Sequence, residues 1–181
     1  MRNFLALICL LVLAGCTKVV PTPVLSGHPK FPKVTGESLE KKPVTIPDDF
    51  AGKPTLLLVG FIQRAQFDID RWILGIIQAE IPVSIVEVPT IAGMFPEMLQ
   101  NTINNGMRSG IPNEDWGSVV TVYNDADKII AAIGNERPQS AAVVLLDQNG
   151  KIVWFYNQGY SAKRLLELKE LVTATEAAAK R

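Results

Sequence analysis

Residues 55–61 form the sequence feature that most limits the possible folds. The run Thr-Leu-Leu-Leu-Val-Gly-Phe is almost wholly apolar and follows a turn-forming Gly-Lys-Pro. A half-exposed strand alternates apolar and polar side chains, whereas a strand covered on both faces is a continuous apolar run. The segment therefore predicts a central strand that is buried on both faces, as in a parallel sheet of an α/β domain.

The residues after this strand predict a β-α-β unit. Residues 66–80 predict a helix and residues 82–88 a second strand, joined by a right-handed crossover. In the helix, apolar residues recur at mixed three- and four-residue steps. These residues are Phe67, Ile69, Trp72, Ile73, Ile76 and Ile77.

The rest of the chain continues the α/β pattern. A turn at Thr35-Gly36-Glu37 and a short β-like segment at 43–46 precede the central strand. Strands are expected at 118–123, 141–146 and 151–156, with a tight Asp-Gln-Asn-Gly turn at 147–150. Helices are expected at 95–105, 125–133 and 161–178, the last with Leu165, Leu168, Leu171 and Val172 on its buried face.

The amino terminus has the parts of a secretory signal. One basic residue precedes an apolar run at 4–12, and small residues follow it before Cys16. The run is shorter than the ~20 apolar residues that span a bilayer. The sequence Leu13-Ala14-Gly15-Cys16 resembles the lipobox of bacterial lipoproteins. The alternative is an ordinary signal peptide with an accidental cysteine.

The lipoprotein resemblance implies a membrane anchor. In that family the cysteine is lipidated and the signal is cut just before it, so residues 1–15 are expected to be removed and Cys16 to carry the acyl chains. Several acyl chains give stable anchoring where one is marginal. Because Thr17, rather than an aspartate, follows the cysteine, the family's sorting rules imply the periplasmic face of the outer membrane.

Cysteine and charge counts exclude several functions. Cys9 leaves with the signal and Cys16 is blocked as a thioether, so the mature domain would have no thiol for disulfide exchange or nucleophilic attack. One histidine and no further cysteine make a metal site improbable. With 18 basic and 18 acidic residues, the chain lacks the basic excess that nucleic-acid binding needs. No cofactor is expected.

Residues 16–33 predict a tether between the membrane and the domain. The segment contains four prolines and has no sustained periodicity. His28 lies within it and is expected to be a solvated linker residue. The folded domain is expected to comprise residues 34–181.

The element order resembles the thioredoxin-like fold over residues 34–175. Residues 50–54 (Phe-Ala-Gly-Lys-Pro) resemble the approach to the first central strand, residues 119–134 a strand, acidic turn and short helix, and residues 146–153 the closing hairpin. Gly159 precedes the last helix, as in that family. The resemblance implies an α/β, thioredoxin-like fold with a central mixed sheet of four to five strands flanked by helices.

The sequence departs from that family where its redox-active members carry cysteines. Residues 61–67 read Phe-Ile-Gln-Arg-Ala-Gln-Phe and contain no thiol. The family's cis-proline would fall near Ala141, and Pro138 lies about three residues before that position. The resemblance thus implies a thioredoxin-like domain without redox chemistry.

A second resemblance involves fewer residues. Trp72 and residues 146–154 (Leu-Asp-Gln-Asn-Gly-Lys-Ile-Val-Trp) resemble a thioredoxin-like family of mitochondrial ATP-synthase assembly factors, which also lacks the paired cysteines. This resemblance implies an assembly or binding role.

The candidate partner-binding site is the loop after the central strand, with Gln63, Arg64 and Gln66. Chains of this topology present working residues at the carboxyl ends of their strands. A helix amino terminus together with Arg64 can bind a carboxylate or a backbone carbonyl of a partner. The alternative is that these side chains are solvated loop residues.

Two functions follow from the residues. The first is a non-catalytic binding or assembly module that is held at the membrane and contacts an envelope protein. The second is a hydrolase or other enzyme of unrecognised type that uses carboxylates. The carboxylate pairs available to it are Asp48 and Asp49, Asp68 and Asp70, and Asp125 and Asp127.

Overall fold

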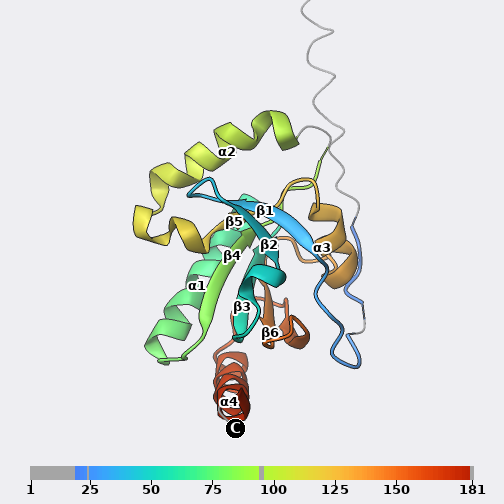
Figure 1. Cartoon of the computed structure of the whole chain (residues 1–181), viewed down its shortest axis with the longest axis vertical. Coiled ribbons are helices and arrows are strands. Elements are labelled where there is room, and N and C mark those ends of the chain that lie inside the picture. The colour runs from blue at the N-terminus through green and yellow to red at the C-terminus, as the bar shows by residue number, and fades with distance from the viewer. Residues whose placement is uncertain (1–18, 24, 94–95, 180–181) are drawn as a thin grey trace, which may run out of the picture.

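The computed structural model describes residues 19–23, 25–93 and 96–179 (Figure 1). The expected signal peptide and the lipidated Cys16 lie outside these residues. Among the described helices, none combines the length and the apolar character needed to cross a membrane.

A four-stranded mixed sheet forms the centre of the domain, in the order β4-β3-β6-β7. Strand β3 (Thr55–Gly60) pairs in parallel with β4 (Ser84–Pro89) and antiparallel with β6 (Ala142–Leu146). Strand β7 (Ile152–Tyr156) closes a hairpin with β6 and forms the edge of the sheet. All six residues of β3 are buried, as the continuous apolar run predicts.

Helices cover both faces of this sheet. Helix α1 (Gln66–Gln78) and α4 (Ala162–Ala179) pack on one face, while α3 (Ala126–Ile133) and a small second sheet pack on the other. Because successive strand residues point to opposite faces, β3 divides its apolar side chains between the two cores. Leu56 and Leu58 face α1 and α4, whereas Leu57 and Val59 face α3 and the small sheet.

The small sheet has the order β2-β1-β5. Its strands are β1 (Val34–Ser38), β2 (Pro43–Ile46) and β5 (Val120–Thr121), all antiparallel. The strand predicted at 118–123 is therefore much shorter, and the residues on either side of β5 form isolated parallel bridges, Val119 with Glu87 of β4 and Val122 with Thr90. The turn predicted at residues 35–37 was wrong, because these residues lie inside β1. Gly36 is required there for close packing, since a Cβ atom would lie 2.7 Å from the Thr121 carbonyl oxygen.

Helix α2 (Pro96–Gly110) connects β4 to a 3-10 helix, η3 (Asn113–Ser118). Two further 3-10 turns are η1 (Asp48–Phe50) and η2 (Gln63–Ala65). Helix α2 crosses the end of the molecule opposite α4 (Figure 1). Of its residues 98–110, only Asn104 is buried.

Several described residues of the segment predicted as a tether are bound to the domain. The Val20 amide donates to Asn135 Oδ1 at 2.6 Å, and the Asn135 amide donates to the Val20 carbonyl at 2.8 Å. Farther along, the Ile152 amide donates to the Pro29 carbonyl, and Phe31 is 2% exposed. Residues 20–23 and 25–31 are called the strap below.

An exposed edge strand explains why the strap binds there. Strand β7 has no neighbouring strand on its outer side, and such edges are commonly covered by other chain segments. Proline lacks an amide donor but keeps its carbonyl acceptor, so Pro29 can accept from β7. His28 is solvent-exposed, as expected, yet its Nδ1 lies 3.2 Å from the Ile152 carbonyl oxygen.

The cis peptide bond in the described part of the chain precedes Pro47, and the bond before Pro138 is trans. In α1, Ile69, Trp72 and Ile76 are buried, as the helical spacing predicts. Phe67 and Ile77, which belong to the same apolar pattern, are exposed.

Candidate functional site

The predicted partner-binding loop lies where β3 ends and α1 begins. Ile62 to Ala65 form a turn closed by a 2.9 Å hydrogen bond from the Ala65 amide to the Ile62 carbonyl. Ala65 is buried and anchors this turn, while Gln63 and Arg64 are exposed. Neither of these two side chains hydrogen bonds to any other described residue. The loop thus presents an amide and a guanidinium to solvent beside the first turn of α1.

Gln66 is oriented differently from the other two predicted residues. Its side-chain amide donates to Asp70 Oδ1 at 3.0 Å and to Glu87 Oε2 at 3.4 Å. Gln66 is only partly exposed. Gln66 therefore connects α1 to β4. Of the three predicted residues, Gln63 and Arg64 lie together in solvent, whereas the Gln66 amide points toward the protein.

Glu87 is a buried carboxyl that sequence reasoning missed. It lies on β4 and is 7% exposed. Burial raises the pKa of Glu87 above its ordinary value, while the hydrogen bond from Gln66 lowers it and the Asp70 charge raises it. The sequence signal that could have identified Glu87 is a single glutamate within an otherwise apolar strand. Charged residues are rarely buried without partners, so such a glutamate indicates a specific local contact.

Asp68 fixes the position of the site. One of its carboxylate oxygens accepts from the Tyr160 amide at 2.7 Å, and the other accepts from the Ala141 amide at 2.9 Å. These amides belong to the segment before β6 and the segment before α4. In the thioredoxin-like resemblance the cis-proline would stand near Ala141. In this protein the Asp68 carboxylate, which belongs to α1, binds that segment instead. Asp68 is therefore a positioning residue.

An aromatic cluster packs against the buried side of α1. Trp72 is fully buried and makes edge contacts with Trp154, Tyr156 and Tyr160 at ring-centroid distances of 6.2, 6.0 and 5.4 Å. Such contacts prefer edge-to-face geometry and stabilise rigid packing. Trp72 is thus a core residue that packs the middle of α1 against β7 and the segment before α4.

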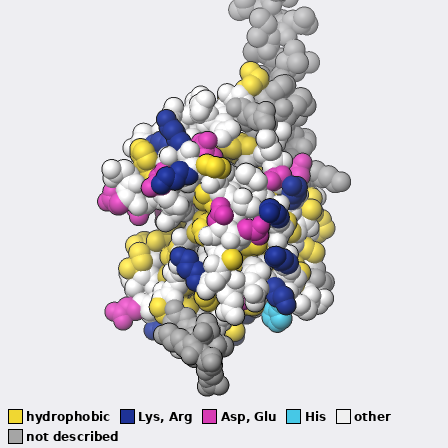
Figure 2. Space-filling model, in the orientation of Figure 1, with side chains coloured by type: hydrophobic (Ala, Val, Ile, Leu, Met, Phe, Trp, Pro, Cys, Tyr) yellow, Lys and Arg dark blue, Asp and Glu magenta, His cyan; other side chains and the backbone are white. Residues whose placement is uncertain are grey.

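The outward side of α1 carries unpartnered apolar side chains. Phe67 is 73% exposed, Leu74 57% and Ile77 64%. Their spacing of seven and three residues puts them along one side of the helix. Hydrophobic atoms gather over α1 at the left of Figure 2. We call Phe67, Leu74 and Ile77 the α1 stripe. Ile62, in the loop before α1, is also exposed, at 43%.

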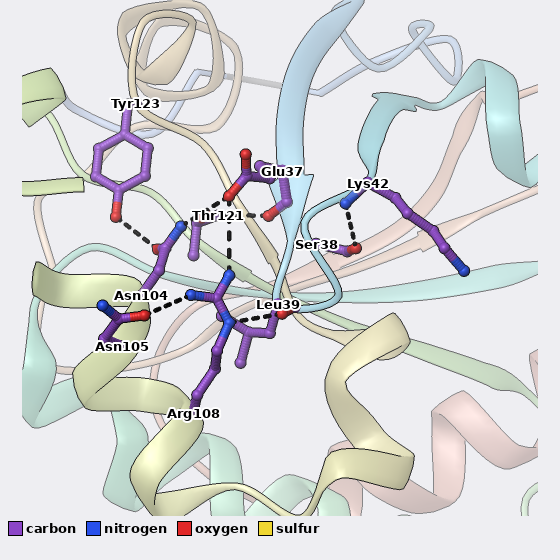
Figure 3. A network of polar contacts seen from close by, with 9 residues as sticks. All are labelled: Glu37, Ser38, Leu39, Lys42, Asn104, Asn105, Arg108, Thr121 and Tyr123. Atoms are coloured by element: carbon purple, nitrogen blue, oxygen red, sulfur yellow. Dashed lines mark hydrogen bonds and ion pairs between the residues drawn. The ribbon is translucent and has the colours of Figure 1, made fainter. Parts of the chain in front are cut away.

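A second polar cluster lies under α2 (Figure 3). Arg108 Nε donates to the Leu39 carbonyl at 2.6 Å, and Arg108 Nη2 lies 3.9 Å from Glu37 Oε1. The Asn104 amide donates to the same Glu37 oxygen, and the Tyr123 hydroxyl donates to Asn104 Oδ1 at 2.8 Å. Burial raises the pKa of Tyr123 to about 12.

This second cluster is structural. The 3.9 Å separation is an ionic contact and too long for a hydrogen bond, so Arg108 Nη2 is buried without a hydrogen-bond partner among the described residues. The other polar groups of the cluster bind one another, which secures the second half of α2 to the hairpin of β1 and β2.

The described residues contain no group of three or more histidine, cysteine or acidic side chains arranged to hold a metal ion. The whole sequence has cysteines only at positions 9 and 16. Residues 34–181 therefore contain no thiolate or imidazole ligand for a soft metal.

Comparison with solved structures establishes the fold. A SCO1/SenC family lipoprotein from Bacillus anthracis superposes with a TM-score of 0.58 and 13% identity, covering 82% of this chain and 96% of the other. BsSco, a member of the Sco family of cytochrome c oxidase assembly proteins, gives a TM-score of 0.58 and 13% identity, covering 87% and 98%.

The exposed lipoprotein thioredoxin Etrx1 from Streptococcus pneumoniae gives a TM-score of 0.53 and 12% identity, covering 77% of this chain and 99% of the other. The chain matches no protein-family model and no curated protein sequence. The domain is thus thioredoxin-like in fold, as the element order predicts, and its likeness to these proteins is one of fold alone.

Proposed function

We propose that this protein is a lipoprotein of the cell envelope whose thiol-free, thioredoxin-like domain binds another envelope protein through the start of α1. The supporting observation is a group of exposed residues at the start of α1. Ile62, Gln63 and Arg64 lie in the loop after β3, and Phe67 lies in the first turn of α1 beside Asp68, whose carboxylate binds two distant backbone amides. The α1 stripe extends this surface. Its chemistry suits a partner with apolar groups and a carboxylate or carbonyl for Arg64.

The absence of thiols supports binding rather than redox exchange. BsSco is described with a disulfide switch, whereas this sequence has no cysteine after Cys16. A disulfide switch needs two thiols within bonding distance. We therefore expect a role that uses the fold as a scaffold, and the assembly role of the Sco family is compatible with it.

The proposal of a lipid anchor is based on the sequence around Cys16. Fold neighbours that are themselves lipoproteins support an envelope location. Thr17 supports the periplasmic face of the outer membrane among the possible locations. The resemblance of Trp72 and residues 146–154 to the ATP-synthase assembly family adds support for assembly and names no partner.

The geometry gives less support to a carboxylate enzyme. Both Asp68 oxygens accept backbone amides, Asp49 accepts the Thr45 amide at 2.7 Å, and Asp125 accepts the Thr35 amide at 2.8 Å. Each of the three pairs thus has a member that holds the backbone. A general acid or base needs a free oxygen that reaches substrate.

Site-specific photo-cross-linking in intact cells tests the proposed surface. A photoreactive phenylalanine analogue would replace Phe67, and a matched control would place it at Leu166, which is 59% exposed on α4. We expect a discrete adduct at position 67, absent at 166 and weakened about threefold by Arg64→Ala, since an exposed charged contact contributes about 0.2–1 kcal/mol. Equal labelling at both positions, or none at 67, would contradict the proposal.

Purified protein should also lack insulin reduction and peroxidase activity. Thiol-dependent turnover from a preparation free of contaminating redox enzymes would contradict the non-redox part. Turnover of an ester or glycoside that disappears in Asp68→Asn but survives in Asp70→Asn would favour the enzyme alternative.

A further inference from the structure

The strap determines how far the domain can move from its anchor. Only three residues separate Cys16 from Val20. Val20 is fixed to Asn135 by the reciprocal backbone and side-chain bonds of 2.6 and 2.8 Å. Since an extended chain advances at most about 3.6 Å per residue, the Cα of Cys16 lies within roughly 14 Å of that of Val20.

The fixing of Val20 is part of a larger contact. Gly134 ends α3 with φ +73°, and a Cβ atom there would lie 2.6 Å from the Thr22 nitrogen. Thr22 Oγ1 donates to Glu136 at 3.0 Å and accepts from the Asn157 amide at 2.8 Å. The strap thus leaves the domain at a defined point beside the end of α3.

The segment that leads into α2 is bound near the opposite end of α3. The Ile91 amide donates to the Val122 carbonyl at 2.9 Å, just before α3 begins. Helix α3 has eight residues, about 12 Å in length, and Val20 is bound just beyond its other end. In Figure 1 the described chain begins beside α3, and α2 and α4 lie at opposite ends of the molecule.

Two apolar side chains near the start of α2, which follow Glu97, are exposed, and the helix carries no charge from residue 98 to residue 107. Met98 is 80% exposed and Leu99 53%. Residues 98–107 (Met-Leu-Gln-Asn-Thr-Ile-Asn-Asn-Gly-Met) contain no acidic or basic side chain. The second half of the helix is held to the domain by Arg108 and Asn104, so Met98 and Leu99 stay directed away from the core.

We propose that the α2 end of the domain rests on the lipid bilayer, with Met98 and Leu99 inserted among the headgroups. This inference rests on the proposed lipidation of Cys16, because that anchor keeps the α2 end within reach of the membrane. Apolar side chains on an uncharged helix face gain free energy at the bilayer interface. The α1 stripe then remains available for a protein partner.

Fluorescence quenching from lipid-borne nitroxides tests this orientation. The full-length chain carrying Met98→Cys would be purified from membranes, labelled with an environment-sensitive fluorophore and reconstituted in phosphatidylcholine vesicles. Under the proposed processing, Cys16 is lipidated and Cys9 is cleaved away, so the introduced thiol is the single labelling position. Leu166→Cys on α4 is the matched control, since Leu166 is also exposed.

We expect nitroxide lipid to quench the label at position 98 about threefold more than the label at 166. Inserting about 15 glycine and serine residues between positions 17 and 18 should reduce that difference, because a long flexible linker lowers the effective concentration at the surface. The quenching at 98 should not require anionic lipid. Equal quenching at both positions, no effect of the insertion, or a strict need for anionic lipid would overturn the proposal.

Mass spectrometry of the amino-terminal peptide separates the two levels of the argument. An unmodified Cys16 would overturn the proposed anchor and the orientation with it. A lipidated Cys16 with equal quenching at 98 and 166 would overturn the orientation and leave the lipoprotein proposal standing.

Discussion

Replacing Asp68 by alanine should destabilise the domain strongly, although the sequence singled out this residue only as one member of a carboxylate pair. The side chain is 8% exposed and accepts the Tyr160 and Ala141 amides at 2.7 and 2.9 Å. Truncation removes both hydrogen bonds and leaves two backbone donors without a partner. It also releases the segments before β6 and before α4 from the start of α1.

The magnitude follows from the two bonds. A hydrogen bond to a charged group contributes about 1.5–3 kcal/mol, and an orphaned buried donor costs a similar amount. Because some water can reach the site, we expect a total loss of about 3–4 kcal/mol for Asp68→Ala. Asp68→Asn should lose about 2 kcal/mol, since the asparagine keeps one acceptor oxygen but directs an amide donor toward the other backbone donor.

Urea unfolding followed by circular dichroism measures this loss. With a slope near 2 kcal/mol per molar urea, Asp68→Ala should lower the midpoint by about 1.5–2 M. Asp70→Ala is the control, because Asp70 is exposed and its replacement should change the stability by about 0.5 kcal/mol or less. If Asp68→Ala shifted the midpoint no more than Asp70→Ala, the assigned positioning role would be wrong.

Three further changes test other parts of the structure. Burial raises the pKa of Glu87 above its ordinary value of 4.5. The charged form of Glu87 therefore destabilises the folded protein, and this effect grows as the pH rises and the carboxyl ionises. Glu87→Gln should raise the melting temperature at pH 7, and the gain should vanish below about pH 4, where the carboxyl is protonated in both the folded and the unfolded state. Tyr123→Phe should lose about 1–2 kcal/mol in urea unfolding and abolish the phenol titration near pH 12. Gly36→Ala should lower the melting temperature by several degrees, since its Cβ would meet the Thr121 carbonyl oxygen at 2.7 Å.

The sequence predicted the central elements of the fold because they follow strong local patterns. The continuous run at 55–61 identified β3, and the Asn149-Gly150 pair identified the turn between β6 and β7. The thioredoxin-like topology followed from the order of these elements. The segments with weak local signals were predicted less well. β5 has two residues and β1 contains a glycine, so their strand pairing depends on residues far along the chain.

The candidate site was predicted only in part. The loop after β3 could be located because strand ends position working residues. The exposure of Phe67 could not be inferred, since it belongs to the same helical pattern as the buried Ile69 and Trp72. Asp68 and Glu87 could not be singled out either, because nothing local distinguishes a carboxylate that meets two distant amides from one that meets water.

The sequence by itself determined the chemistry that is available to this protein. Cysteines stand only at positions 9 and 16, and one histidine is present in the chain, so the composition alone excludes thiol exchange by the domain. Only the tertiary structure decided where side chains act. It bound the proline-rich strap to α3 and β7, turned Gln66 toward Glu87, and left the α1 stripe and Met98 in solvent. The physical reason is that composition and periodicity are local properties, whereas burial and hydrogen-bond partners depend on segments that folding brings together from distant parts of the chain.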